Sequence, residues 1–409
     1  MTTMLVPLFT APVIEFRQLA PVLILFAAAL LGVLVDSFLL RDLRRWRDEI
    51  QMGLVIGSTL AALVYVVLNA RLGLAGPLAM GSIMLDGPTY IMWGSLLIFG
   101  LLGMLVFSER HLDNGASVFT PAASSIPGSV HEAEALTARL EHSEVFPLAL
   151  FSLAGMMVFL AATDLLTMFV GLEVMSLPLY LLSAMARRRR LLSQEAALKY
   201  FLLGAFSSAF FLFGMALLYG YAGSFDLKAI DAAITSPYYG PGLLYVGLAM
   251  LAIGMLFKIG VVPFHNWVPD VYVGAPTPVT GFMAVCTKLA AVGATARVFF
   301  VALGAERWSW QPTMAVLAVL TMALGAILAL TQTDIKRMLA YSSIAHAGFL
   351  LTAIVGANAD PGVQVNSMGS IMFYLIAYGF ATIAAFAIIT MVRNSAGEVT
   401  AISGWAGLG

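Results

Sequence analysis

The sequence predicts an all-α protein, a polytopic bundle of transmembrane helices. Hydrophobic residues make up 61% of the 409 residues and charged residues only 11%, whereas a soluble domain carries about 25% charged residues. The apolar residues also form continuous runs of roughly 20, the length of a membrane-spanning helix. These runs lack the alternation of a β-barrel strand, so a helical bundle is the spanning architecture that they support.

Eleven apolar runs follow one another along the chain, separated by short polar connections and by one long polar loop at 108–144. The first run is too long, and is followed by too many others, to be a cleaved signal peptide. The expected helices lie at 18–39, 51–69, 84–107, 145–162, 164–185, 195–221, 241–262, 278–303, 312–331, 337–356 and 369–392.

The basic residues of the connections predict the orientation, because Lys and Arg are retained on the cytoplasmic side. With the N-terminus outside, thirteen basic residues fall in cytoplasmic connections and four in outer ones. The cytoplasmic set is Arg41, Arg44, Arg45, Arg47, Arg110, Arg139, Arg187, Arg188, Arg189, Arg190, Lys336, Arg337 and Arg393, and the outer set is Arg17, Arg71, Lys228 and Arg307.

The run of four arginines from Arg187 to Arg190 has two interpretations. It can anchor the topology, which is the simpler explanation, or it can dock a lipid or a partner. The basic residues as a whole are too scattered along the chain to form a phosphate-binding patch. We therefore expect no nucleic-acid partner.

Four ionisable residues lie inside the apolar runs, namely Glu173, Lys199, Lys258 and Lys288. A charge at the bilayer centre costs about 2.5 to 3.5 kcal/mol on insertion scales, so these residues indicate an ion or proton path. Glu173 and Lys288 each lie about ten residues into their runs, and because a helix rises about 1.5 Å per residue, both fall near the middle of the membrane. Lys199 lies about one turn into its run, where snorkelling to the surface is the alternative.

Lys258 is followed closely by Gly260 and Pro263. Proline removes a backbone donor and clashes with the preceding turn, so the helix should break there. A broken helix at membrane depth persists only where it is buried in protein or lines a wet cavity, and such breaks mark transport sites. The sequence therefore predicts a hydrated discontinuity beside Lys258.

Several ordered blocks of sequence resemble one known family. They are LEVMSLPLYLL, EAALKYFLLGA, FKIGVVPFHNWVPDVYVGAPTPVT and TQTDIKRMLAYSSIAHAGFLL. Together they closely resemble the antiporter-like subunits of respiratory complex I, and the DVYVGAPTPVT continuation is most similar to the subunit N type. The resemblance covers residues from about 145 onward, together with the three leading helices that bacterial members carry.

The resemblance implies roles for individual residues. Glu173 matches a glutamate of the fifth helix, which forms a modulating pair with the lysine of the broken seventh helix, here Lys258. Lys288 matches an eighth-helix lysine that relays protons toward the second half of the subunit, and Lys199 matches a lysine of the sixth helix. His346 stands where a polar relay residue would be useful, although a histidine with satisfied hydrogen bonds explains it equally well.

The resemblance also implies the domain organisation. The family has fourteen helices, with two inverted five-helix repeats that each contain a broken helix. We expect three N-terminal helices at 1–107, the cytoplasmic loop at 108–144, a first repeat at 145–303 and an incomplete second repeat at 312–409. The second broken helix would fall near 425–440, so its lysine is not expected among these residues.

Redox chemistry is expected in other subunits. The chain has neither a dinucleotide-binding glycine motif nor a phosphate-binding loop, and its single cysteine, Cys286, excludes a cysteine-ligated iron–sulfur cluster. The resemblance places NADH, FMN, iron–sulfur clusters and quinone in partner subunits and implies no cofactor here. It also implies neighbouring membrane subunits, lipid and protons as partners. The implied location is the bacterial plasma membrane, with the mitochondrial inner membrane as the alternative.

Two alternative functions remain open from the sequence. One is a subunit of a multisubunit cation/proton antiporter or of a membrane-bound hydrogenase, which shares the glutamate and lysine pattern. The other is a structural membrane scaffold whose charges only stabilise helix packing. A scaffold gives no reason for the break beside Lys258.

Overall fold

The computed structural model describes residues 14–38, 46–110, 112, 117–120, 128–137, 143–238, 240–356, 367–394 and 397–408. Residues 111, 113–116, 121–127 and 138–142 of the polar loop at 108–144 lie outside these residues, as do Arg41, Arg44, Arg45 and Arg139 of the predicted cytoplasmic set. The remaining members of both basic sets are described.

All eleven predicted helices are present, which confirms the predicted fold class. They are α1 (Phe16–Phe38), α2 (Arg47–Arg71), α3 (Gly87–Phe107), α5 (Val145–Ala161), α6 (Leu165–Ser183), α7 (Arg190–Ala222), α9 (Gly242–Ile259), α11 (Thr277–Arg297), α12 (Arg307–Leu330), α13 (Ile335–Val355) and α14 (Ser367–Met391). In the described part of the chain, ten helices are long and apolar enough to cross a membrane, and α5 is a shorter apolar helix.

Several shorter elements join the long helices. Helices α4 (Val130–Thr137), α8 (Leu227–Thr235) and α10 (Trp267–Gly274) are too short to span a bilayer. Strands β1 (Gly76–Leu78) and β2 (Ile83–Leu85) pair antiparallel, as do β3 (Arg393–Asn394) and β4 (Gly397–Glu398). A π-helical turn at Val298–Ala302 extends α11, and 3-10 turns lie at Ala79–Gly81 and Ile402–Trp405.

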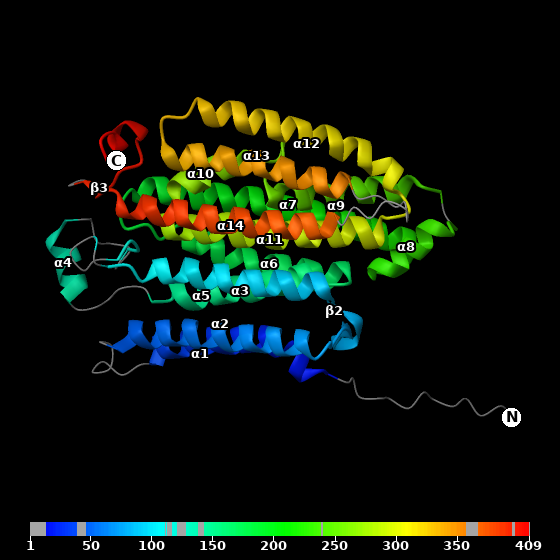
Figure 1. Ribbon diagram of the computed structural model, residues 1–409, viewed down its shortest axis with the longest axis horizontal. Coiled ribbons are helices and arrows are strands. Elements are labelled where there is room, and N and C mark those ends of the chain that lie inside the picture. The colour runs from blue at the N-terminus through cyan, green and yellow to red at the C-terminus, as the bar shows by residue number, and fades with distance from the viewer. Residues whose placement is uncertain are drawn as a thin grey trace.

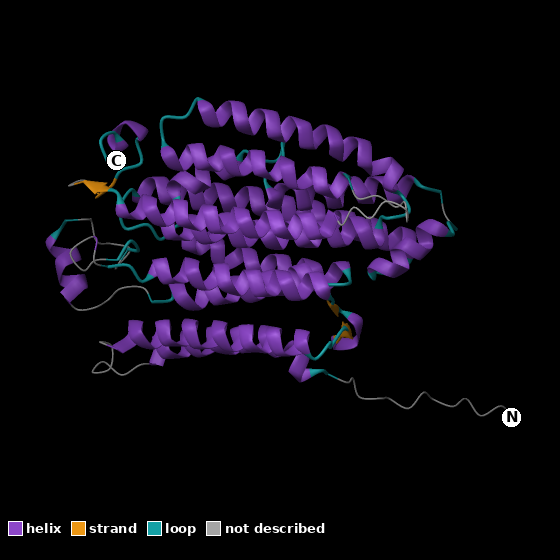
Figure 2. Cartoon of the chain, viewed as in Figure 1, coloured by secondary structure: helices purple, strands orange, loops and turns teal. Residues whose placement is uncertain are grey.

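The long helices lie side by side and alternate in direction (Figure 1). Helix α4, the β3 strand and the C-terminus lie at one end of the bundle, and α8 and β2 lie at the other. Figure 2 shows that strands are confined to the two ends of the helices. The described basic residues of the predicted cytoplasmic set belong to the end that carries α4 and β3, since α7 and α13 begin there and α14 ends there.

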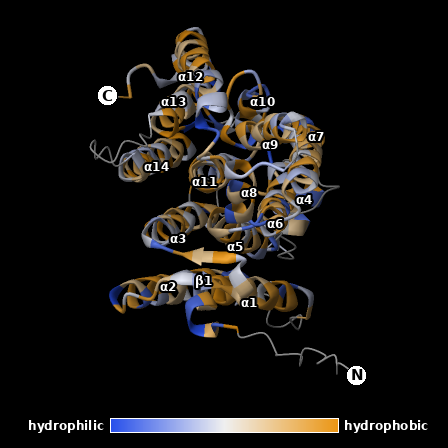
Figure 3. Cartoon of the chain, turned by 90° about the vertical axis from the view of Figure 1, so that its right-hand side faces the viewer, coloured by the Kyte–Doolittle hydropathy of each residue, from blue (hydrophilic) through white to orange (hydrophobic). Residues whose placement is uncertain are grey.

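Helix α11 forms the centre of the bundle, as the end view of Figure 3 shows. It contacts α3, α5, α6, α9, α13 and α14. In the most apolar 18-residue stretch of α11, 83% is buried inside the protein, whereas the corresponding share for the peripheral α12 is 22%. Helices α1 and α2 form a separate layer against α3 and α5. Whatever α11 carries in its middle turns is therefore enclosed by protein.

Aspartates fix where several helices begin. Asp86, Asp164, Asp226 and Asp334 each precede a helix, and their carboxylates accept a hydrogen bond from the backbone N–H three residues later, at 2.9, 2.7, 2.8 and 3.0 Å. An aspartate at this position satisfies one of the free donors of the first turn and stabilises the helix by about 1 kcal/mol.

The predicted break is present between α9 and α10. Gly260 ends α9 with φ +84°, and its N–H donates to Leu256 O and Phe257 O. Backbone groups freed by the break find partners within the protein, since Val262 N donates to Thr321 Oγ1 at 3.1 Å and Trp267 Nε1 to Phe257 O at 2.9 Å. This is the condition under which non-helical backbone is tolerated at membrane depth.

Candidate functional site

Lys258 lies in the last turn of α9, directly before the break, with a relative exposure of 3%. Its amine donates a hydrogen bond to Ser176 Oγ on α6, at 2.8 Å. The amine also lies 5.6 Å from the centre of the Tyr180 ring and 5.7 Å from that of Tyr200. A hydroxyl and two aromatic faces therefore surround this lysine.

Glu173 lies one helical turn before Ser176 on α6. Its charge acts electrostatically on Lys258, but the two side chains form no direct ion pair within the described residues. Glu173 Oε1 is buried and has no hydrogen-bond partner in the described part of the chain. In this structure the amine of Lys258 is bound to the hydroxyl of Ser176 and not to the Glu173 carboxylate, so the modulating pair stays a prediction.

Glu173 also belongs to an outward stripe of α6. The residues at the same helical spacing, Leu166, Val170, Leu177 and Leu181, are 49%, 52%, 51% and 58% exposed. Glu173 itself is only partly buried. An ionised carboxylate in this position is costly against lipid, so this face of α6 needs a polar or cationic neighbour.

Lys288 lies in the middle of α11 and is likewise 3% exposed. Its amine donates to the backbone oxygen of Ser343 and, at 2.6 Å, to Ser343 Oγ on α13. It also lies 5.0 Å from the centre of the Tyr378 ring on α14. Three helices meet at this lysine.

Hydroxyl groups continue from Lys288 toward α14. Tyr378 donates a hydrogen bond to Ser343 Oγ at 2.8 Å. His346 lies one turn beyond Ser343, with its ring centre 5.0 Å from that of Tyr378, and its Nδ1 is 2.5 Å from the hydroxyl of Tyr374. His346 therefore has a hydrogen-bonding partner in Tyr374 and also lies beside Tyr378 of the Lys288 cluster, and its role as a relay residue stays a prediction.

Lys199 has a different environment from the two buried lysines. Its side chain is 42% exposed and forms ion pairs with Glu195 and Asp270, both at 2.8 Å. Arg337 pairs with the same Asp270 at 2.6 Å. Exposed pairs of this kind contribute about 0 to 1 kcal/mol each. Lys199 nevertheless ties α7 to α10, the segment that follows the break.

The sequence did not reveal that a further lysine is buried. Lys336, assigned to a connection, lies in the first turn of α13 with 3% exposure. Its amine donates to Val273 O at 3.2 Å and to Ala275 O at 2.9 Å. These carbonyls end α10, so Lys336 caps the second part of the broken helix. His265 also serves the break, because its carbonyl accepts from Val268 N at 2.9 Å.

Two ion pairs hold the ends of the bundle. Arg187 donates from Nε to Glu132 of α4 at 2.8 Å, and this bond lowers the pKa of the Glu132 carboxyl. At the opposite end, burial raises the pKa of Asp86, but the charge and hydrogen bonds of Arg297, 3.0 Å away, outweigh it, so the pKa is lowered. Both carboxylates stay ionised at neutral pH.

Within the described residues, no group of three or more His, Cys, Asp or Glu side chains could hold a metal ion. The structure instead assembles hydroxyl groups around amines. Ser176, Ser343 and Tyr378 were not singled out from the sequence, where the only available signal was a polar side chain inside an apolar run.

Comparisons with known proteins identify the family of the chain. Residues 162–408 match the family described as NADH:quinone oxidoreductase/Mrp antiporter, TM. The NADH-quinone oxidoreductase subunit N of Nocardioides sp. is 51% identical over 412 residues, which cover 98% of this chain and 77% of the relative. The chain belongs to the NADH-quinone oxidoreductase subunit N family. The subunit N of Rhodococcus opacus is 53% identical over 98% of this chain and 75% of its own length.

Solved structures extend the family comparison to the fold. A chain of respiratory complex I from Thermus thermophilus is similar with a TM-score of 0.67 and 32% identity, over 90% of this chain and 70% of that one. A chain of the Mrp complex from Dietzia sp. gives a TM-score of 0.72 at 20% identity, over 91% of this chain and 64% of that one. The second likeness concerns the fold alone.

Proposed function

We propose that the chain is a proton-translocating membrane subunit of an NADH:quinone oxidoreductase of the complex I type. The observation that supports this best is the pair of buried lysines, each 3% exposed. In the described part of the chain, their amines are hydrogen-bonded to serine hydroxyl and carbonyl oxygens and to no carboxylate. Such an amine can release a proton and recover it without first breaking an ion pair.

The residues have separate roles in this proposal. Glu173 modulates Lys258 beside the broken helix, and Lys288 relays the proton across the middle of the membrane. Ser343, Tyr378 and His346 extend the path from Lys288 by hydroxyl and imidazole groups that can both donate and accept. Lys199, through Asp270, is the partner on the uptake side.

The energy for translocation comes from other subunits. We assign NADH, FMN, iron–sulfur clusters and quinone to these partners and no redox site to this chain. A neighbouring membrane subunit covers the outward stripe of α6 and supplies the partner that Glu173 needs. The electrostatic change at Glu173 and Lys258 couples the subunits but supplies no net energy.

The proposed location is the bacterial plasma membrane, with the N-terminus outside. The excess of basic residues at the end that carries α4 and β3 supports this orientation. The predicted organisation is retained here too, with three leading helices, a first five-helix repeat at 145–303 and part of an inverted second repeat at 312–409. Helices α12, α13 and α14 would then correspond to α5, α6 and α7.

Substitution of the buried lysines tests the proposal. In inverted vesicles, Lys258→Met and Lys288→Met should each lower NADH-driven proton pumping at least tenfold, because the charge is removed while most of the side-chain volume is kept. Assembly is checked by subunit composition. Lys228→Met, at an exposed position on α8, is the control and should pump normally. Normal pumping in both buried variants would refute the relay assignment.

A subunit of a cation/proton antiporter or of a hydrogenase is the alternative, since the same family description includes the Mrp antiporters. The two candidates differ in what surrounds the chain. Purification of the native complex, followed by identification of its subunits, separates them. Co-purifying flavin and iron–sulfur subunits agree with the first candidate, and a complex without them contradicts it.

A further inference from the structure

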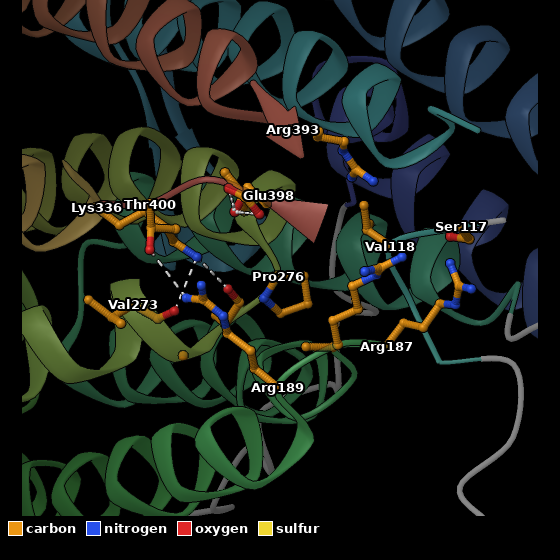
Figure 4. Close-up of a pocket in the computed structure, with 15 residues that line it drawn as sticks. Ser117, Val118, Arg187, Arg189, Val273, Pro276, Lys336, Arg393, Glu398 and Thr400 are labelled. Carbon is orange, nitrogen blue, oxygen red and sulfur yellow. Dashed lines mark hydrogen bonds between the residues drawn. The ribbon is translucent and has the colours of Figure 1, made fainter. Parts of the chain in front are cut away.

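A cavity of about 100 Å³ lies at the end of the bundle that carries β3, where α10 ends and α11 begins. Its lining is strongly basic, with Arg187, Arg188, Arg189, Lys336 and Arg393 against one acidic residue, Glu398. The sequence suggested that basic residues were too scattered for a phosphate-binding patch. The fold corrects this, because it gathers cations from the α6–α7 turn, α13 and β3 around one cavity (Figure 4).

Part of this charge is already compensated. Arg187 is paired with Glu132 at 2.8 Å. The Glu398 carboxylate accepts from Thr277 Oγ1, at 2.5 and 2.8 Å, at the first residue of α11. A carboxylate of the chain thus already occupies the positive end of this helix. The carboxylate of Glu398 therefore shows that a negatively charged oxygen is stabilised at this position of the cavity.

Arg189 and Lys336 remain without a bound carboxylate. Lys336 donates to two carbonyls, and Arg189 Nη1 donates to Thr400 Oγ1 at 3.3 Å, with no ion pair among the described residues. Figure 4 shows the Arg189 guanidinium beside the Lys336 amine. The carboxylates of Glu398 and Asp334 act on Lys336 favourably, and the charge of Arg189 opposes them. Like charges held together are stabilised when an anion lies between them.

The backbone holds Arg189 in this place at a cost. Its φ is +55°, in the left-handed region, which costs a non-glycine residue about 1 to 2 kcal/mol. The preceding turn is fixed by two backbone bonds, from Thr120 N to Met185 O and from Arg187 N to Val118 O, both at 2.9 Å. Strain that the surrounding structure maintains at a cationic cavity points to a binding role.

The depth of the cavity indicates the source of the anion. α6 ends at Ser183, α7 begins at Arg190 and α14 ends at Met391, so the cavity lies level with the ends of three helices. This is the level of lipid headgroups. Basic pockets between transmembrane helices bind phosphate-bearing headgroups. We infer that this cavity binds a phosphate group, supplied by the headgroup of an anionic phospholipid.

Lipid binding to the purified complex tests the inference. After delipidation in detergent, the complex is loaded with phosphatidylglycerol, with phosphatidylcholine or with inorganic phosphate, and the bound species are counted by native mass spectrometry. Phosphatidylglycerol should be retained in preference to phosphatidylcholine. Arg189→Gln should weaken its retention about fivefold, since a basic residue near the surface contributes about 1 kcal/mol. Arg307→Gln, at the opposite end of the bundle, is the matched control and should change nothing.

A second variant should act in the opposite direction. Glu398→Gln removes the one carboxylate of the lining, keeps an acceptor for Thr277 and should strengthen phosphatidylglycerol retention about fivefold. If the Arg189→Gln complex fails to assemble, the Glu398→Gln variant alone tests the phosphate site. Unchanged retention in Glu398→Gln, or in an assembled Arg189→Gln complex, overturns the site. Binding of inorganic phosphate without preference for phosphatidylglycerol keeps the phosphate site and overturns the lipid source.

The outcome does not depend on proton translocation, because retention is measured without turnover. A complex that retains phosphatidylglycerol while the pumping variants behave normally would uphold this site and refute the proposed function.

Discussion

The two buried lysines are equally hidden but differently surrounded. Lys258 and Lys288 are both 3% exposed. Lys258 lies in the last turn of α9 before the break, donates to one hydroxyl and is acted on by the charge of the Glu173 carboxylate. Lys288 lies within unbroken α11, and in the described structure it holds a hydroxyl and a carbonyl of Ser343 with no carboxylate bound. The first lysine is arranged to respond to a neighbouring charge and the second to a fixed set of hydroxyl groups.

Magnitudes support this division. With an effective dielectric near 20, opposite charges attract by about 4 kcal/mol at 4 Å and about 1.7 kcal/mol at 10 Å. Moving Glu173 relative to Lys258 therefore changes the energy by about 2 kcal/mol, against about 3.5 kcal/mol for one charge crossing 150 mV. A single hydrogen bond at Lys288 contributes about 1 kcal/mol. Charge removal near Lys258 should thus exceed hydroxyl removal near Lys288.

Glu173→Gln should have the larger effect. The variant keeps the shape of the side chain and removes the charge that acts on Lys258, so we expect NADH-driven pumping in inverted vesicles to fall about tenfold. Glu134→Gln is the control, because Glu134 lies on α4, outside the spans, with a side chain that is 69% exposed, and its substitution should alter pumping little. Equal effects of the two substitutions would contradict the distinction between a modulating and a peripheral carboxylate.

Tyr378→Phe should have a smaller effect. It removes the hydroxyl that donates to Ser343 at 2.8 Å but leaves the ring beside Lys288, so pumping should fall about fivefold, corresponding to about 1 kcal/mol. Tyr65→Phe, on the exposed face of α2, is the control with the same chemical change. A Tyr378→Phe complex that pumps like the control would show that Lys288 does not depend on this hydroxyl.

Glu132→Gln should have the smallest effect on pumping. Glu132 lies outside the spans and receives bonds from Arg187 Nε at 2.8 Å and Gly128 N at 2.7 Å. Its loss should lower stability by about 2 kcal/mol, measured as the thermal unfolding midpoint, while pumping of the assembled complex stays normal.

The sign of the pH dependence follows from the lowered pKa of Glu132. The stabilisation is present above its ordinary value near 4.3 and is lost as the pH falls through the lowered value. The difference between wild type and Glu132→Gln should therefore shrink below about pH 4.3. A difference that stays constant through this range would mean that the ion pair with Arg187 does not stabilise the fold.

The helices were predictable because membrane spans have a strong local signal. About twenty consecutive apolar residues mark each long helix. Gly260 and Pro263 mark the break, because each acts on the backbone conformation at its own position. The short elements were missed for the same reason. Helices α4 and α8 have eight and nine residues, and neither has the length on which the prediction of a span depends.

The site was only partly predictable, because its contacts join distant residues. Charged residues inside apolar runs stand out, so Glu173, Lys258 and Lys288 were found. Their partners do not stand out, since Ser176 lies 82 residues from Lys258 and Ser343 lies 55 residues from Lys288. Lys336 was assigned to a connection because only the folded α10 supplies the carbonyls that bind it. Likewise, only packing brings Lys336 and Arg393 to the arginines of the α6–α7 turn around the basic cavity.

Cys286 lies on α11, two residues before Lys288, and is the chain's one cysteine. Its thiol is fully enclosed in the core. A maleimide can reach it only while the helices around α11 are apart. The alkylation rate of the Cys286 peptide, followed by mass spectrometry during turnover and at rest, therefore reports how often the centre of the bundle opens. Cys286 is thus a built-in probe for the opening of the core.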